Sequence, residues 1–162
     1  MNALDLLKKQ HQELKKMFQQ MEKLEGGGAE KERAFARLAD AIAAHAAIEE
    51  RYFYPAVNVE ETEELLLESA EEHLAAKRVL ADLLDLNIGD RTFDPKIKIL
   101  EELVINHSDE EERRLMPLVK ELVDAQALDD LGIQLEEAYD EIIQEEPRAN
   151  VPAETDAPAH IS

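Results

Sequence analysis

Two segments of this chain, 62 positions apart, share a pattern that constrains its fold more than any other feature. Residues 45–57 read HAAIEERYFYPAV, and residues 107–119 read HSDEEERRLMPLV. Aligned without gaps, the two segments match at a histidine, two glutamates, an arginine, a proline and a valine. The same offset of 62 residues pairs His11 with His73 and Lys15 with Lys77. Four histidines in two equally spaced pairs predict a chain built from two copies of one helix pair.

The length and charge of the chain limit what it can be. A chain of 162 residues fits one domain with a single core. It carries 18 lysines and arginines against 38 aspartates and glutamates, which gives a net charge of −20. This charge argues against nucleic acid and anionic membrane surfaces as partners. We interpret the acidity mainly as a solvated outer surface, although the excess would also attract metal ions.

The chain contains no cysteine. This excludes disulfides, thiolate metal sites, iron–sulfur clusters and cysteine nucleophiles, so any metal ligands must be nitrogen or oxygen atoms. The N-terminal residues lack a basic region followed by an apolar run, and no uncharged apolar stretch approaches the roughly 18 residues of a membrane span. We therefore expect a soluble, cytoplasmic protein.

Four long segments repeat apolar residues at the spacing of one helical face. They run from Asn2 to the glycines at 26–28, from about Ala29 towards Pro55, from about residue 58 to residue 87, and from Asp94 towards Pro117. No segment alternates apolar and polar residues for long enough to predict a strand. Long helices with short connections predict an all-α protein, an antiparallel up-and-down four-helix bundle.

The C-terminal part of the chain divides into two pieces. Apolar residues at helical spacing between Leu128 and Ile142 predict a short additional helix, which covers one side or end of the bundle or meets another copy. Residues 147–162 contain three prolines and no periodicity, so we expect a disordered tail. The predicted domain organisation is therefore a bundle with its C-terminal helix over 1–146 and a tail over 147–162.

In each long segment a histidine takes a position that the pattern reserves for a core side chain. His11 and His45 lie at similar distances from the glycine turn between them, so on antiparallel helices they reach the same level. The offset of 62 residues puts His73 and His107 in the same relation. The four imidazoles are therefore predicted to form one layer.

Two glutamates share the helix faces of these histidines. Glu49 and Glu111 each follow a histidine by four residues, about one helical turn. Ionised carboxylates in an apolar core are strongly destabilising unless a cation compensates them. Imidazole and carboxylate ligands suit iron, manganese or zinc, and a symmetric set of six favours a pair of ions, with iron preferred. The candidate metal ligands are His11, His45, Glu49, His73, His107 and Glu111.

Each of these residues also has a purely structural interpretation. A single buried histidine is more often held by one hydrogen bond than by a metal. A lone glutamate after a histidine is commonly half exposed and paired with an arginine such as Arg51 or Arg113. Repetition of the whole set at one offset favours the metal interpretation. Glu50, Glu110 and Glu112 fall beside the inner face, and we interpret them as solvated or as supporting the ligands from outside.

This set of residues, with Pro55 and Pro117 closing the two repeated segments, resembles the hemerythrin-like (HHE cation-binding) domain family over about residues 2–123. The resemblance implies a non-haem di-iron centre, in which an oxo or hydroxo bridge and the carboxylates of Glu49 and Glu111 join two Fe ions. The four histidines would be terminal ligands. The family's activities include reversible dioxygen binding, sensing of oxygen, iron or nitric oxide, peroxide breakdown and repair of iron centres, and the resemblance does not choose among them.

The sequence departs from the oxygen-carrying hemerythrins, which have a second histidine one turn after the ligand of the third helix. Lys77 stands at that position. The resemblance then implies a metal position open to water, peroxide or nitric oxide, which favours reactive or sensing chemistry over dioxygen carriage. Lys15 and Lys77 are expected to extend into solvent, and Tyr52 to pack in the core.

Two other functions stay open. One is a non-catalytic metal-binding or iron- or oxygen-sensing module, which acts through a protein partner or self-associates through the C-terminal helix. The other, iron storage, is weaker because one bundle has no cavity for a mineral. Whether the protein is an enzyme is not decided by the sequence.

Overall fold

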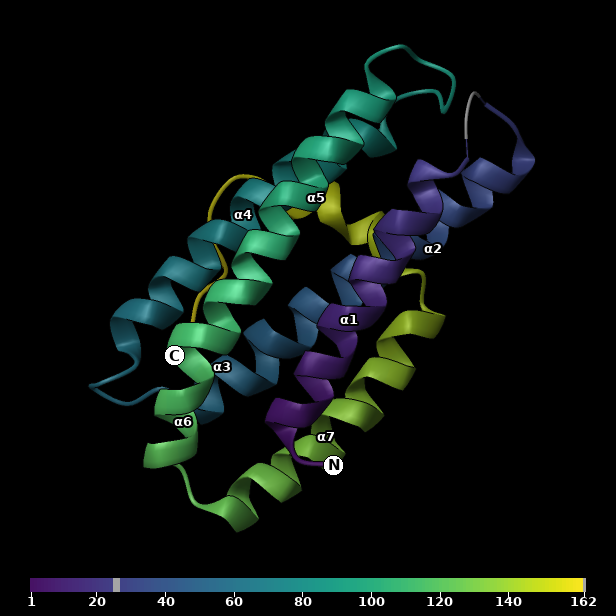
Figure 1. The fold of residues 1–162 in the computed structure, drawn as a ribbon. Coiled ribbons are helices and arrows are strands. Elements are labelled where there is room, and N and C mark those ends of the chain that lie inside the picture. Colours follow the sequence, from purple (N-terminus) through teal and green to yellow (C-terminus); the bar gives the residue numbers. More distant parts are fainter. Residues whose placement is uncertain (25–26, 162) are drawn as a thin grey trace.

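Residues 1–24 and 27–161 are described in the computed structural model of this chain, and they contain helices and turns but no strand. Figure 1 shows the helices of the bundle side by side, each running opposite to the one before it. They are α1 (Ala3–Glu22), α2 (Ala29–Ile48), α4 (Glu63–Leu84) and α5 (Phe93–Glu110). This confirms the predicted all-α bundle. None of the described helices is both long enough and apolar enough to cross a bilayer.

The ends of the helices follow local hydrogen bonds. The Asn2 side chain accepts a hydrogen bond from the backbone amide of Asp5 at 2.9 Å and so caps α1. The start of α4 at Glu63 is later than predicted, because the Thr62 hydroxyl donates to the carbonyl of Val57 at 2.7 Å and stabilises a turn before the helix. Gly26, which was expected to help end α1, lies outside the described residues.

Both repeated segments widen into a π-helical turn. In the first copy the backbone amide of Tyr54 bonds to the carbonyl of Glu49, five residues back, and the second copy does the same. The proline that follows explains the widening, because its ring would collide with the carbonyl four residues before it in a regular α-helix. The π turns are η1 (Glu49–Phe53) and η2 (Glu111–Leu115), and the chain continues as α3 (Tyr54–Ala56) and α6 (Met116–Leu122).

The interior contains two apolar cores, one towards each end of the bundle. The first includes Phe18, Leu38, Leu80 and Leu100. The second includes Leu7, Ile48, Leu66 and Leu115. Along α1, His11 lies between Leu7 of the second core and Leu14 of the first. The predicted level of the histidines therefore falls between the two cores.

The helix α7 (Ala125–Gln144) packs against α1 and α2 of its own bundle. Its apolar face, including Leu128 and Leu135, is buried in the second core. At Gly132 it approaches the N-terminus so closely that a Cβ atom would lie 2.5 Å from the carbonyl oxygen of Met1. The prediction left open one side or end of the bundle and contact with another copy, and the structure shows the helix along α1 and α2. With 20 residues it is as long as α1, not short as predicted.

The tail differs from the prediction. Residues expected to be disordered form the 3-10 helix η3 (Pro147–Glu154), which contacts α2 and α4 and appears in yellow in Figure 1. Val151 is buried in the first core, and the Arg148 guanidinium donates to the Asp40 carboxylate at 2.6 Å. Buried apolar residues and ion pairs therefore order a segment whose composition resembles that of a disordered chain.

Candidate metal centre

The structure brings the six predicted ligands together in one buried layer between the two apolar cores. α1, α2, α4 and α5 each contribute a histidine, and η1 and η2 each begin with one of the glutamates. The ligand atoms form two groups, and within each group all of them lie within 4.8 Å of one another. The groups are His11, His45, Glu49 and Glu111, and Glu49, His73 and His107. We call these six residues the ligand layer.

An acceptor from a neighbouring helix fixes the outward nitrogen of each histidine. The Nδ1 atoms lie 2.6, 2.7, 2.7 and 3.0 Å from side-chain oxygens. Because carboxylate and amide oxygens only accept, each Nδ1 must donate a proton, and each neutral ring therefore presents an unprotonated Nε2 to the interior. The pairs are His11 with Glu112, His45 with Gln10, His73 with Glu50, and His107 with Glu72.

These four acceptors follow the duplication of the chain. The offset of 62 residues pairs Gln10 with Glu72 and Glu50 with Glu112. Of the glutamates expected beside the inner face, Glu50 and Glu112 support the ligands, whereas Glu110 forms ion pairs with arginines at the surface. Gln10 and Glu72 were not predicted, and the signal available in the sequence was that each directly precedes a paired histidine.

The interior of the layer holds hydrogen-bond acceptors in excess. Four buried atoms have no hydrogen-bond partner among the described residues, namely Nε2 of His11 and His45, Oε2 of Glu49 and Oε1 of Glu111. The Nε2 atoms of His73 and His107 lie 3.0 Å apart. Two lone pairs at that distance repel unless a proton or a cation lies between them. The layer therefore fits cations bound by imidazole nitrogens and carboxylate oxygens.

Comparison with known proteins agrees with this chemistry. The sequence profile of the hemerythrin HHE cation binding domain matches residues 2–119. The chain belongs to the hemerythrin HHE cation-binding family. A crystal structure of a hemerythrin HHE cation binding domain-containing protein from Mycobacterium kansasii has a similar fold, with a TM-score of 0.81 and 22% identity over 90% of this chain and 89% of that chain. The comparison with curated proteins gave no match.

One residue at the centre of this hemerythrin domain was not predicted. Tyr54 is fully buried, and its hydroxyl donates to Oε2 of Glu111 at 2.6 Å. The same hydroxyl lies 3.3 and 3.4 Å from the Nε2 atoms of the α4 and α5 histidines. The π turn η1 brings Tyr54 onto this face, which a regular helical spacing from Glu49 would not. Tyr52, considered from the sequence, is half-buried and packs beside the second core as expected.

The pKa values of the layer show how strongly its groups interact in the metal-free protein. Burial alone would lower the pKa of His107, but hydrogen bonds to three carboxylates outweigh it and raise that pKa well above its ordinary value. The pKa values of His11 and His73 are raised for the same reasons. Burial would raise the pKa of Glu49, but the charge of His45 and several hydrogen bonds lower it well below its usual range. Protons therefore compete with cations for the layer, and metal binding should release them.

Lys77, which replaces the second histidine of the oxygen carriers, was expected to extend into solvent. The structure shows that it does not. Its side chain is buried, and Nζ donates to Glu50 and to Glu154 at 2.9 Å each. The other carboxylate oxygen of Glu50 accepts the Nδ1 proton of His73. This lysine is therefore connected to the ligand layer through one carboxylate. Lys15, its counterpart in the repeat, is exposed as predicted.

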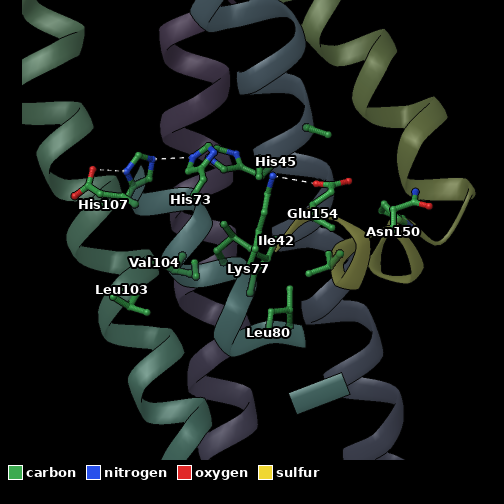
Figure 2. Close-up of a pocket in the computed structure, with 18 of the residues that line it drawn as sticks. Ile42, His45, His73, Lys77, Leu80, Leu103, Val104, His107, Asn150 and Glu154 are labelled. Carbon is green, nitrogen blue, oxygen red and sulfur yellow. Dashed lines mark hydrogen bonds and ion pairs between the residues drawn. The ribbon is translucent and has the colours of Figure 1, made fainter. Parts of the chain in front are cut away.

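A cavity of about 80 Å³ lies against one side of the layer. Figure 2 shows His45, His73 and His107 at one end and apolar side chains such as Val104 and Leu80 along the walls. Residues of η3 close it from outside. A small molecule in this cavity would contact three of the four imidazoles.

Proposed function

We propose that this hemerythrin-domain protein holds two Fe ions in the ligand layer and uses them to bind or react with dioxygen, peroxide or nitric oxide. The observation that carries the proposal is the buried excess of acceptor atoms, which only cations or protons can balance. Two ligand groups that share Glu49 suit two ions linked by a carboxylate. Nitrogen and oxygen ligands would also accept manganese or zinc, and we favour iron because of the family resemblance.

The chain's own residues would prepare the site for this chemistry. Bound iron would supply the redox change and a position for the small ligand. The four Nδ1 acceptors hold the rings in one orientation and keep each Nε2 directed inwards. The Tyr54 hydroxyl keeps a proton beside Glu111, where it can donate a hydrogen bond to a bound ligand or to the carboxylate. The two apolar cores exclude bulk water from both sides.

Metal analysis tests the iron site. Anaerobic reconstitution with ferrous iron, removal of unbound metal and elemental analysis should give two Fe ions per chain, and oxidation should produce absorption bands that shift with azide. Glu111→Gln should lose bound iron, whereas Glu110→Gln, a change at the adjacent surface residue, should retain it. Fewer than two Fe ions per chain in the wild type, or equal retention by both variants, would contradict the proposal.

The reaction is tested separately on the iron-loaded protein. We expect peroxide to be consumed, because Lys77 takes the place of a ligand that the dioxygen carriers have. Disproportionation of two hydrogen peroxide molecules into two waters and one dioxygen balances without an external reductant, so an oxygen electrode measures it directly. A stable, reversible dioxygen adduct with no peroxide consumption would instead indicate a carrier.

The alternative of a non-catalytic module that acts through a protein partner has less support than the sequence suggested. It was motivated by the extra helix and the tail, and the structure accounts for both within the bundle, since α7 completes the second core and η3 closes the cavity. An iron-loaded protein that changes neither peroxide nor dioxygen would restore this alternative. A cytoplasmic location also stays a prediction.

A further inference from the structure

Two hollows meet at the ion pair between Lys77 and Glu154. The inner one is the cavity of about 80 Å³ beside the ligand layer. The outer one lies at the surface, where Ala157 and His160 of the tail form part of its wall. Both are lined by Lys77 and Glu154, whose Nζ and Oε1 atoms are 2.9 Å apart. The ion pair therefore stands between the two hollows. Figure 2 shows it beside His45.

The backbone around Glu154 is held by several contacts, whereas its side chain is held by the ion pair with Lys77. On one side Val151 is buried, at 2% exposure, and Arg148 pairs with Asp40 at 2.6 Å. On the other side Nε of Arg78 donates to the carbonyl of the next residue at 3.0 Å. The Glu154 side chain is 39% exposed and has room to turn outwards. Opening would therefore need a change of one side chain and no movement of η3.

The other half of the bundle lacks this arrangement. The repeat offset pairs Lys77 with Lys15 and Glu50 with Glu112, so the same lysine and glutamate occur beside His11. Lys15 is exposed, and among the described residues no segment equivalent to η3 covers it. His11 is also the histidine of the layer that does not line the cavity. The tail thus adds a covered approach on one side of a site whose six ligands follow the twofold repeat.

The size of the cavity limits what it can hold. A water molecule needs about 10–15 Å³ of such volume, so about 80 Å³ accepts a diatomic molecule or hydrogen peroxide. A benzene ring fits an apolar cavity of about 150 Å³. A hydroperoxide that carries a phenyl group is therefore too large.

We propose that the pair of Lys77 and Glu154 is the gate through which ligands reach the layer, and that η3 restricts the site to substrates of the size of hydrogen peroxide. Organic hydroperoxides with a ring are excluded. This inference rests on the proposed function, because it names the substrate class of the same site.

The first experiment uses the metal-free protein and so does not depend on the reaction. Hydroxyl radicals, which are no larger than the proposed substrate, oxidise accessible imidazoles, and peptide mass mapping gives a rate for each one. Glu154→Ala removes the gate, Val151→Ala widens the cavity, and Asp156→Ala, an exposed neighbour, is the control. We expect Glu154→Ala to increase modification of His45 roughly three- to ten-fold, as expected for loss of one partly buried ion pair, with His11 unchanged. An unchanged rate at His45, or an equal increase at His11, would overturn the gate.

The second experiment compares hydrogen peroxide with cumene hydroperoxide as substrates of the iron-loaded protein. The wild type and Asp156→Ala should consume hydrogen peroxide at least roughly ten-fold faster than cumene hydroperoxide. In Val151→Ala and Glu154→Ala the ratio of these two rates should be smaller. Circular dichroism and urea unfolding check that each variant is folded. If the wild type binds no iron, the proposed function fails while the His45 result still decides the gate. If the iron-loaded wild type consumes no peroxide, the restriction to substrates of the size of hydrogen peroxide fails. If peroxide is consumed and the ratio is the same in all variants, the gate inference fails and the proposed function stands.

Discussion

Replacing Tyr54 with phenylalanine removes one hydroxyl from the centre of the protein and leaves the ring in place. The hydroxyl has one proton, and the 2.6 Å contact directs it to Oε2 of Glu111. A hydrogen bond to a charged group contributes about 1.5–3 kcal/mol, and after the substitution the nearest remaining nitrogen to that oxygen is Nε2 of His107 at 3.4 Å. We therefore expect Tyr54→Phe to lower the free energy of unfolding of the metal-free protein by about 1.5–3 kcal/mol.

Urea denaturation in the presence of a chelator measures this change. For a chain of this length about 1 kcal/mol shifts the melting temperature by about 2–4 °C, so calorimetry should show a decrease of about 3–12 °C. Tyr52→Phe is the matched control, since Tyr52 is half-buried beside the second core and no hydrogen bond to its hydroxyl is formed in the described part of the chain. The control should change stability by less than about 0.5 kcal/mol.

Two results would refute this reasoning. If Tyr54→Phe were as stable as the wild type, the hydroxyl would contribute no net hydrogen bond to the carboxylate. If both tyrosine variants lost the same stability, the loss would come from general packing and not from the contact with Glu111.

Three further predictions follow from the same structure. In the urea assay Gly132→Ala should destabilise the fold by about 1–3 kcal/mol, because the new Cβ would lie 2.5 Å from the carbonyl oxygen of Met1. Gly89→Ala is the control and should change stability little, because there is open space around Gly89. The stability of the metal-free protein should fall as pH rises above about 6.5, because the pKa of His107 is raised in the folded state. The stabilisation from a raised histidine pKa is complete below the pKa of the unfolded chain and is lost as pH rises through the pKa of the folded protein. A urea midpoint that rises over this range would contradict the prediction. Burial raises the pKa of Tyr54 well above its ordinary value, and burial with nearby carboxylates raises the pKa of Tyr139 to about 12, so ultraviolet titration of the metal-free protein should show two tyrosines that stay protonated well above pH 10, and Tyr54→Phe should remove one of them.

The repeat made the bundle and the convergence of the six candidate ligands predictable from the sequence. His11 and His107 are far apart in the chain, yet each occupies a core position at the same level of its helix, and one offset relates them to the other two histidines. Helical periodicity carries that information because the helices are long and antiparallel. Gln10 and Glu72 differ in type and act on histidines of other helices, so the repeat did not single them out.

Other features depend on contacts that no periodicity records. Tyr54 lies on the inner face because the turn before Pro55 is π-helical, and a count based on a regular helix points it elsewhere. The ordered tail depends on Val151 and on the ion pair of Arg148, both of which need partners from α2 or the core to have any effect. Lys77 is buried for the same reason, since η3 supplies Glu154.

The ligand layer separates two apolar cores, and this division bears on how the molecule unfolds. With ions in place, all four long helices are joined at mid-height, and the two ends should melt as one cooperative unit. Without ions, only hydrogen bonds and bound protons hold the middle together, so one end can open while the other persists, and the melting transition should broaden. Limited proteolysis would then cut the metal-free chain first, and the lifetime of the protein would follow the supply of its metal.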